Sequence, residues 1–315
     1  MDSGRRPCGP SPSIAGGRLG LRYDLSDTRG GSIGPGLQNT AQTDRHSWYA
    51  ALLCTFWKDC LLTSSATSHV SKIPAVTLGF WVIKILATTL GETGGDTVSM
   101  TMDLGYLAAT AIFLSTLIVL VVLQIKAKAF HPILYWATIV ASTTAGTTMA
   151  DFADRSLGIG YAGGSLLLLA CVLGALAAWY KTEGTVSVQT VNTPRVEAFY
   201  WLTITFSQTL GTALGDWAAD SGLGYGGGAA AFGAALLCVA AVYFWTRISR
   251  VMLFWVAFIL TRPLGATVGD FFDKPVDQGG LAVSRLVASA IIAAIMIACI
   301  VLIPQRAGDH PRTES

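Results

Sequence analysis

Four aspartates recur in one register along the chain, and this pattern is typical of a site for a cation or a proton. Each lies fifteen residues after a tryptophan and directly follows a glycine or an alanine. Carboxylate oxygens suit hard cations, and four carboxylates held close together repel one another unless a cation or a proton joins them. The four are Asp96, Asp151, Asp216 and Asp270.

Polar residues precede each aspartate at spacings that place them on the same helical face. At 100° per residue, positions 3, 7 and 11 after the tryptophan share an arc with the aspartate at position 15. The polar residues at these positions are Lys84, Thr88, Glu92, Thr143, Thr147, Gln208, Thr212 and Arg262. Lipid cannot satisfy such a stripe, so it must face the interior of a helix bundle. We expect the acids, hydroxyls and amide of this stripe to contact an ion or another substrate.

Glu92 is predicted to pair with at least one of two bases of the stripe, Lys84 and Arg262. Their positions differ from that of Glu92 by eight and four residues, or about 12 and 6 Å along a helix axis, so Arg262 is the better partner. Five acids against two bases would leave the interior with three excess negative charges. Two interpretations without transport stay open: the aspartates cap helix ends, and the deeper charges form ion pairs that only fix helix packing.

The tryptophans and a glycine ten residues after each mark a fourfold repeat. The tryptophans are Trp81, Trp136, Trp201 and Trp255, and the glycines are Gly91, Gly146, Gly211 and Gly265. The tryptophans are expected to anchor the helices at the membrane interface, and the glycines to allow close helix packing. The hydroxyls of the stripe have a simpler alternative role, which is to bond to their own helix backbone.

Long apolar stretches indicate which segments of the chain cross the membrane. Charged residues are 13% of the chain against about 25% in soluble domains. The stretches 104–125, 156–180, 221–246 and 286–305 contain no charged residue, and each is at least as long as the roughly 20 residues that cross a bilayer. Four further apolar segments, at about 76–95, 133–150, 198–215 and 251–269, alternate with them. The sequence predicts an all-α polytopic membrane protein with eight transmembrane helices.

The eight helices form four tandem two-helix repeats, at about 76–125, 133–180, 198–246 and 251–303, within a membrane domain of residues 72–305. An even number of crossings gives every repeat the same direction, so the repeats are parallel. The spacing leaves two arrangements open, a ring of four repeats and two halves of four helices.

The segment from Lys84 to Asp96 is the most specific part of a resemblance to a known family. The chain resembles bacterial membrane proteins built from four tandem repeats of unknown function, each with two spans and a signature tryptophan. The resemblance covers about residues 72–305 and implies the fold and a membrane location, but no activity. The residues from Glu92 to Thr97 also resemble a motif of manganese and calcium exchangers, although a second glycine intervenes and the basic residue of that motif is missing.

Basic residues near the ends of the predicted spans indicate orientation. Lys and Arg flank the loops on the side of both termini, whereas the alternate loops are rich in Asp. Both termini, including a tail at residues 306–315, are therefore expected on the cytoplasmic side of the inner membrane. Residues 1–70 are rich in Gly, Ser, Pro and Arg over most of their length. They are expected to be a flexible extension, or to precede a true start near Val70.

The function that these features favour is secondary transport of a cation, either a divalent metal or a proton-coupled ion. The two alternatives are a structural or regulatory membrane protein and a carrier of small organic molecules. A net charge of +2 gives no basic surplus for nucleic acid. An enzyme is not expected, because the chain contains no nucleophile motif, no HExxH and no phosphate loop, and its four histidines lie outside the spans. No cofactor is expected, the metal is not identified, and the lipid bilayer is the expected partner.

Overall fold

A computed structural model describes residues 71–308 of the chain. The expectations for residues 1–70 and for the last residues of the tail lie outside this range. Within the described part, eight long α-helices alternate with short π and 3₁₀ turns, and an isolated bridge between Pro74 and Ala307 is its one β-type pairing.

The first helices of the four repeats carry the aspartates. They are α2 (Leu78–Asp96), α4 (Pro132–Asp151), α6 (Pro194–Ala218) and α8 (Arg250–Asp273). Local sequence explains where they begin, because Thr77, Thr193 and Ser249 accept a backbone N–H from the first helical turn. Proline stands in the first turn of α4 and α6, where its missing N–H costs nothing.

The second helices of the repeats are α3 (Gly105–Lys126), α5 (Tyr161–Glu183), α7 (Gly224–Trp245) and α9 (Arg285–Leu302). In the first three repeats a π turn joins the two helices: η1 (Thr97–Thr101), η2 (Phe152–Ser156) and η4 (Ala219–Leu223). The fourth repeat differs, since its connection contains the 3₁₀ turn η5 (Val276–Gln278). A further 3₁₀ turn, η3 (Val188–Thr190), precedes α6.

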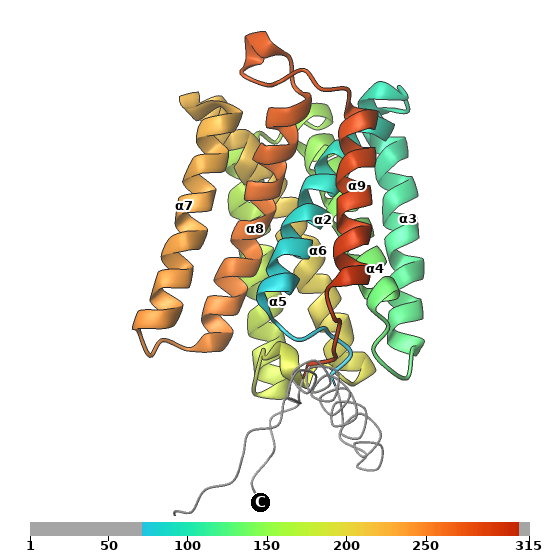
Figure 1. Cartoon of the computed structure of the whole chain (residues 1–315), viewed down its shortest axis with the longest axis vertical. Coiled ribbons are helices and arrows are strands. Elements are labelled where there is room, and N and C mark those ends of the chain that lie inside the picture. The colour runs from blue at the N-terminus through green and yellow to red at the C-terminus, as the bar shows by residue number, and fades with distance from the viewer. Residues whose placement is uncertain (1–70, 309–315) are drawn as a thin grey trace, which may run out of the picture. The chain divides into compact units, whose positions relative to one another are not determined.

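The four first helices form a closed ring. Helix α2 packs against α4, α4 against α6, α6 against α8, and α8 back against α2. Each second helix packs mainly on the first helix of the next repeat, so α3 covers α4, α5 covers α6, α7 covers α8 and α9 covers α2. Figure 1 shows α7 and α3 at opposite outer edges of this bundle. Of the two arrangements that the repeat spacing left open, the structure has the ring.

The distribution of polar and apolar side chains is the reverse of that in a soluble protein. The inner helices bury many hydroxyl side chains, whereas the outer helices expose large apolar side chains such as Leu166 (68%) and Leu237 (72%). Five helical stretches are long and apolar enough to cross a membrane, and one of them, Pro194–Trp245, contains both α6 and α7. Helices α2 and α4 are outside this set because the polar stripe lowers their hydropathy. This distribution fits a protein embedded in lipid.

The two ends of the described chain meet at one end of the ring. The backbone N–H of Ala75 donates to the carbonyl of Arg306 at 2.8 Å, and that of Gly308 donates to the carbonyl of Ile73, also at 2.8 Å. At the same end, the ammonium of Lys72 lies 2.6 Å from Oε1 of Glu197. This end of the ring is called the terminal end below, and the other is called the acid end.

Candidate ion-binding site

Each glycine of the repeat receives a side chain from the next first helix around the ring. A Cβ atom added at Gly146 would lie 2.9 Å from Gln208, and one added at Gly211 would clash with Arg262. The other two glycines face Thr143 and Thr88 in the same way. The residue seven positions after each tryptophan therefore packs on the glycine of the preceding repeat. This close approach lets the polar stripes meet along one axis.

The stripes lie in the interior position that the sequence predicted. The residues at positions 3, 7, 11 and 15 of all four first helices are at most 5% exposed. From the terminal end they form four successive layers. These are a mainly apolar layer with Lys84, a layer with Thr88, Thr143, Gln208 and Arg262, a layer with Glu92, Thr147 and Thr212, and the carboxylate ring of Asp96, Asp151, Asp216 and Asp270.

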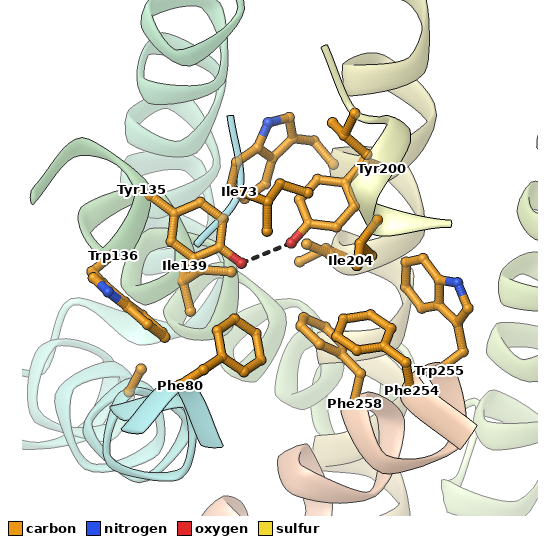
Figure 2. Close-up of a cluster of buried hydrophobic side chains, with 14 of the residues drawn as sticks. Ile73, Phe80, Tyr135, Trp136, Ile139, Tyr200, Ile204, Phe254, Trp255 and Phe258 are labelled. Carbon is orange, nitrogen blue, oxygen red and sulfur yellow. Dashed lines mark hydrogen bonds between the residues drawn. The ribbon is translucent and has the colours of Figure 1, made fainter. Parts of the chain in front are cut away.

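An aromatic cluster fills the terminal end of the ring. Phe80, Tyr135, Tyr200 and Phe258 are at most 2% exposed, and the hydroxyls of Tyr135 and Tyr200 share a hydrogen bond of 2.7 Å (Figure 2). Apolar side chains of the same cluster, among them Ile139 and Ile204, surround this pair. At this end the ring axis is packed with ring systems and aliphatic side chains.

Three of the signature tryptophans belong to this cluster, which corrects the expectation that they are interface anchors. Trp136, Trp201 and Trp255 are between 1% and 4% exposed, and Trp255 donates from Nε1 to the carbonyl of Val186 at 2.9 Å. Only Trp81 is partly exposed among the four. The physical reason is that each tryptophan follows an aromatic residue on an inner helix, so both rings pack between neighbouring helices rather than in lipid.

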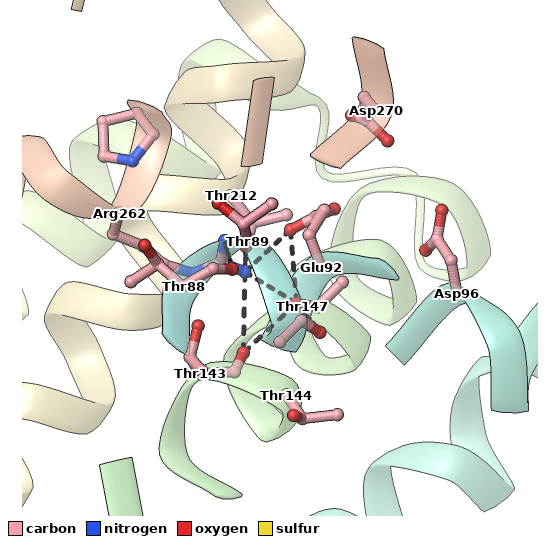
Figure 3. Close-up of polar contacts among 12 residues, drawn as sticks. Thr88, Thr89, Glu92, Asp96, Thr143, Thr144, Thr147, Thr212, Arg262 and Asp270 are labelled. Carbon is pink, nitrogen blue, oxygen red and sulfur yellow. Dashed lines mark hydrogen bonds and ion pairs between the residues drawn. The ribbon is translucent and has the colours of Figure 1, made fainter. Parts of the chain in front are cut away.

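Arg262 is the centre of the polar layers. Its Nη2 lies within hydrogen-bond distance of three oxygens: Glu92 Oε2 at 2.8 Å, Thr147 Oγ1 at 2.6 Å and Thr212 Oγ1 at 2.5 Å (Figure 3). Glu92 is 2% exposed and Arg262 is fully buried. One guanidinium on the fourth repeat therefore contacts a residue from each of the other three repeats. Its Nη1 also lies 3.5 Å from the carbonyl of Thr88. The structure contains the Arg262–Glu92 pair that the sequence favoured.

Lys84 does not take part in this network. Its ammonium lies 4.2 Å from the centre of the Phe258 ring, at the border of the aromatic cluster. No hydrogen-bond partner for its Nζ is present among the described residues. Two of the four threonines of the stripe bond to their own helices: Thr88 donates to the carbonyl of Ile85 at 2.8 Å, and Thr147 donates to the carbonyl of Thr143 at 3.2 Å. Thr147 and Thr212 both contact Arg262.

Two basic residues divide the carboxylate ring into two pairs. Lys274 Nζ lies 2.8 Å from Asp96 and 3.0 Å from Asp270. Arg155 lies 2.8 Å from Asp151 and 3.7 Å from Asp216. The expected surplus of three negative charges is therefore wrong, because two bases assigned to outer loops reach into the ring.

The two bases also share one position in the repeat. Each lies nineteen residues after its tryptophan and four after its aspartate, in repeats 2 and 4 only. The helical backbone continues past the aspartate in both, so a side chain one turn later returns to the same face. The polar stripe predicted from the sequence ends at the aspartate, so it does not include these two bases. It also does not include Arg285, which lies 3.0 Å from Asp273 and 3.8 Å from Asp96.

Lys274 lies just outside α8 and is 6% exposed. Burial alone would lower the pKa of its ammonium, but the carboxylates of Asp270 and Asp96 outweigh burial and raise that pKa above its ordinary value. Lys274 therefore carries its charge at neutral pH.

Glu92, Asp96 and Asp270 form a group of carboxylates that could hold a metal ion. One oxygen from each lies within 4.8 Å of the others, and all three residues are buried. Figure 3 shows their carboxyl groups around a common space beside the Arg262 network. An ion with oxygen ligands at about 2.4 Å places opposite ligands about 4.8 Å apart. Asp96 Oδ1 is buried without a hydrogen-bond partner among the described residues, so this carboxylate retains the capacity to bind one. This group is called the carboxylate cluster below.

The comparison with protein families matches the repeat architecture. The family described as Repeat of Unknown Function (DUF347) matches at residues 79–130, 134–185, 199–249 and 253–304, about two thirds of the chain. No curated protein and no solved structure matches the chain. Each of the four matches contains one inner and one outer helix, as the resemblance to a four-repeat family predicted. The chain therefore belongs to the family of the Repeat of Unknown Function (DUF347).

Proposed function

We propose that the chain is an integral membrane protein that transports a hard cation along the axis of the helix ring. In this proposal all eight long helices cross the inner membrane, and both termini lie in the cytoplasm. Alternation of the helices and the excess of Lys and Arg on the side of the termini support this orientation. The carboxylate cluster would then face the outer side, and the aromatic cluster would close the axis toward the cytoplasm.

The convergence of Glu92, Asp96 and Asp270 is the observation that carries the proposal. Buried carboxylates within a membrane are costly and are typical of ion pathways. Carboxylate oxygens within 4.8 Å of one another match the ligand geometry of a hard cation such as Mn²⁺, Ca²⁺ or Mg²⁺. Thr147 and Thr212 supply hydroxyl oxygens in the same layer as Glu92, next along the axis.

One observation favours the alternative of a structural membrane protein. Every aspartate of the carboxylate ring has a basic group within 4 Å, supplied by Lys274 or Arg155. Ion pairs of this kind can serve packing alone. The alternative predicts that removing one carboxylate changes stability without any effect on ion movement, because no ion moves.

Flux into proteoliposomes tests the proposal. The purified full-length chain is reconstituted around the dye calcein, and quenching by external Mn²⁺ is followed in time. We expect faster quenching than in empty vesicles, and a return to the empty-vesicle rate in the Asp96→Asn and Asp270→Asn variants. Asp277→Asn is the control, since Asp277 is an exposed acid in the loop after α8. A parent rate equal to that of empty vesicles, or unchanged rates in both ring variants, would favour the structural alternative.

A further inference from the structure

Lys274 occupies the carboxylate cluster in the way that a bound cation would. Its ammonium lies between Asp96 and Asp270, two of the three residues that could hold a metal ion, at 2.8 and 3.0 Å. The side chain is 8% exposed, so protein rather than solvent surrounds this charge. A metal ion that bound the two oxygens in contact with the ammonium, Asp96 Oδ2 and Asp270 Oδ1, would have to take the place of the ammonium.

The backbone after α8 holds Lys274 in this position. The N–H of Leu281 donates to the carbonyl of Phe271, and the N–H of Ala282 donates to the carbonyl of Lys274, at 2.8 and 2.9 Å. Gly280 lies against the carbonyl of Lys274, where a Cβ atom would clash. The loop therefore folds back over the end of α8. It also brings Arg285 to the same place, 3.8 Å from Asp96.

Charge balance indicates which cation can replace the ammonium. Arg262 already neutralises Glu92 through a contact of 2.8 Å. When Asp96 and Asp270 are both ionised, they carry two negative charges, and Lys274 returns one positive charge to them. A divalent ion on the same two aspartates balances both charges, whereas a monovalent ion gains nothing over the ammonium that is already present.

We propose that Lys274 is a tethered counter-cation of the carboxylate cluster, and that a divalent cation binds by displacing it. This inference rests on the proposed function and names the substrate class of that same site. The displaced ammonium gives the protein two alternating states, one with Lys274 on the aspartates and one with the metal there. Such mutual exclusion couples binding of the ion to movement of the loop after α8.

Binding of Mn²⁺ to the purified full-length protein tests this inference. Free Mn²⁺ is counted by its electron paramagnetic resonance signal in titrations of the parent and of the Lys274→Met variant. Removal of the competing charge should lower the Kd for Mn²⁺ about tenfold or more, within the range usual for coupled ligands. Lys274→Arg retains a cation and should bind Mn²⁺ much as the parent does. Lys128→Met, at an exposed lysine distant in sequence, is the control.

Thermal unfolding distinguishes the loss of a counter-cation from a general destabilisation of the Lys274→Met variant. Without metal, Lys274→Met should have a lower Tm than the parent because two buried aspartates lose their partner. Millimolar Mn²⁺ should restore much of the loss, and should raise the Tm of this variant more than that of the parent. A purely structural lysine would give a lower Tm that Mn²⁺ does not restore.

Different results would overturn the proposed cation site and the proposed counter-cation. If Asp96→Asn abolishes Mn²⁺ binding while Lys274→Met leaves the Kd unchanged, the counter-cation is overturned and the cation site stands. If neither the parent nor Lys274→Met binds Mn²⁺ or Ca²⁺, both the counter-cation and the proposed function are overturned. If Lys274→Met binds Mn²⁺ more tightly than the parent, and the additional change Asp270→Asn removes that binding, the cation site and the counter-cation are both supported.

Discussion

Arg262 donates to Glu92 at 2.8 Å across the contact between the last and the first repeats, so one buried ion pair closes the ring of inner helices. Neither side chain is more than 3% exposed. The same guanidinium bonds the hydroxyls of Thr147 and Thr212, which come from the two intervening repeats. A single side chain thus holds together four segments that are distant in the sequence.

The pair predicts non-additive effects of mutation. Glu92→Gln or Arg262→Gln alone leaves one buried charge without its partner and should destabilise the protein by about 3–5 kcal/mol. The double variant leaves neither charge, so it should lose less than the sum of the two single losses. Unfolding of all four proteins in one detergent completes the cycle. Simple additivity would contradict an energetic coupling between the two residues.

Close packing of Gly211 against Arg262 predicts a steric effect. The Gly211→Ala variant places a methyl group where the side chain of Arg262 begins, so either the helices separate or the arginine moves. We expect a loss of about 1–3 kcal/mol, as is usual for an overpacked interior. Gly174→Ala on α5 is the matched control, because an added Cβ there meets no atom within 4 Å. Equal unfolding curves for the two variants would show that the ring tolerates a wider spacing.

The aromatic cluster predicts a leak when it is opened. Phe258→Ala removes a fully buried ring from the terminal end of the axis and leaves a cavity beside Lys84. We expect faster passive Mn²⁺ influx into proteoliposomes than with the parent. Leu237→Ala on α7 is the comparison, since Leu237 is 72% exposed on the outer face of the bundle. A Phe258→Ala rate at or below that of the parent would place the barrier elsewhere.

Loop accessibility tests the proposed orientation. In a background with the native cysteines replaced, Asp103→Cys and Asp220→Cys place thiols in exposed loops of the acid end, and Gln189→Cys places one at the opposite end. An impermeant maleimide added to intact cells should label the first two and not the third. Lysis should then expose the thiol of the Gln189→Cys variant. Labelling of that variant alone in intact cells would reverse the proposed topology.

The repeat spacing predicted the inner helices and their polar faces because it is a local property of the chain. Position 15 after each tryptophan identified Asp96 and its three counterparts, and axial rise alone favoured Arg262 over Lys84 as the partner of Glu92. These inferences need only helical geometry and the low polarity of lipid.

Contacts between repeats were less accessible from the sequence. Lys274 and Arg155 follow the apolar spans, so their charges indicated outer loops rather than the carboxylate ring. Their true place depends on whether the helical backbone continues past the aspartate, which a hydropathy pattern does not reveal. The tryptophans were misplaced for a related reason. Trp136 could face lipid or a neighbouring inner helix, and only the ring arrangement decides between the two.

Anomalous diffraction from crystals of the full-length protein grown with Mn²⁺ would show whether the carboxylate cluster binds a divalent cation. We expect an anomalous peak among the oxygens of Glu92, Asp96 and Asp270, with Lys274 moved away from Asp96 and Asp270. An ordered site without anomalous signal, in which Lys274 still bridges both aspartates at millimolar Mn²⁺, would contradict this expectation.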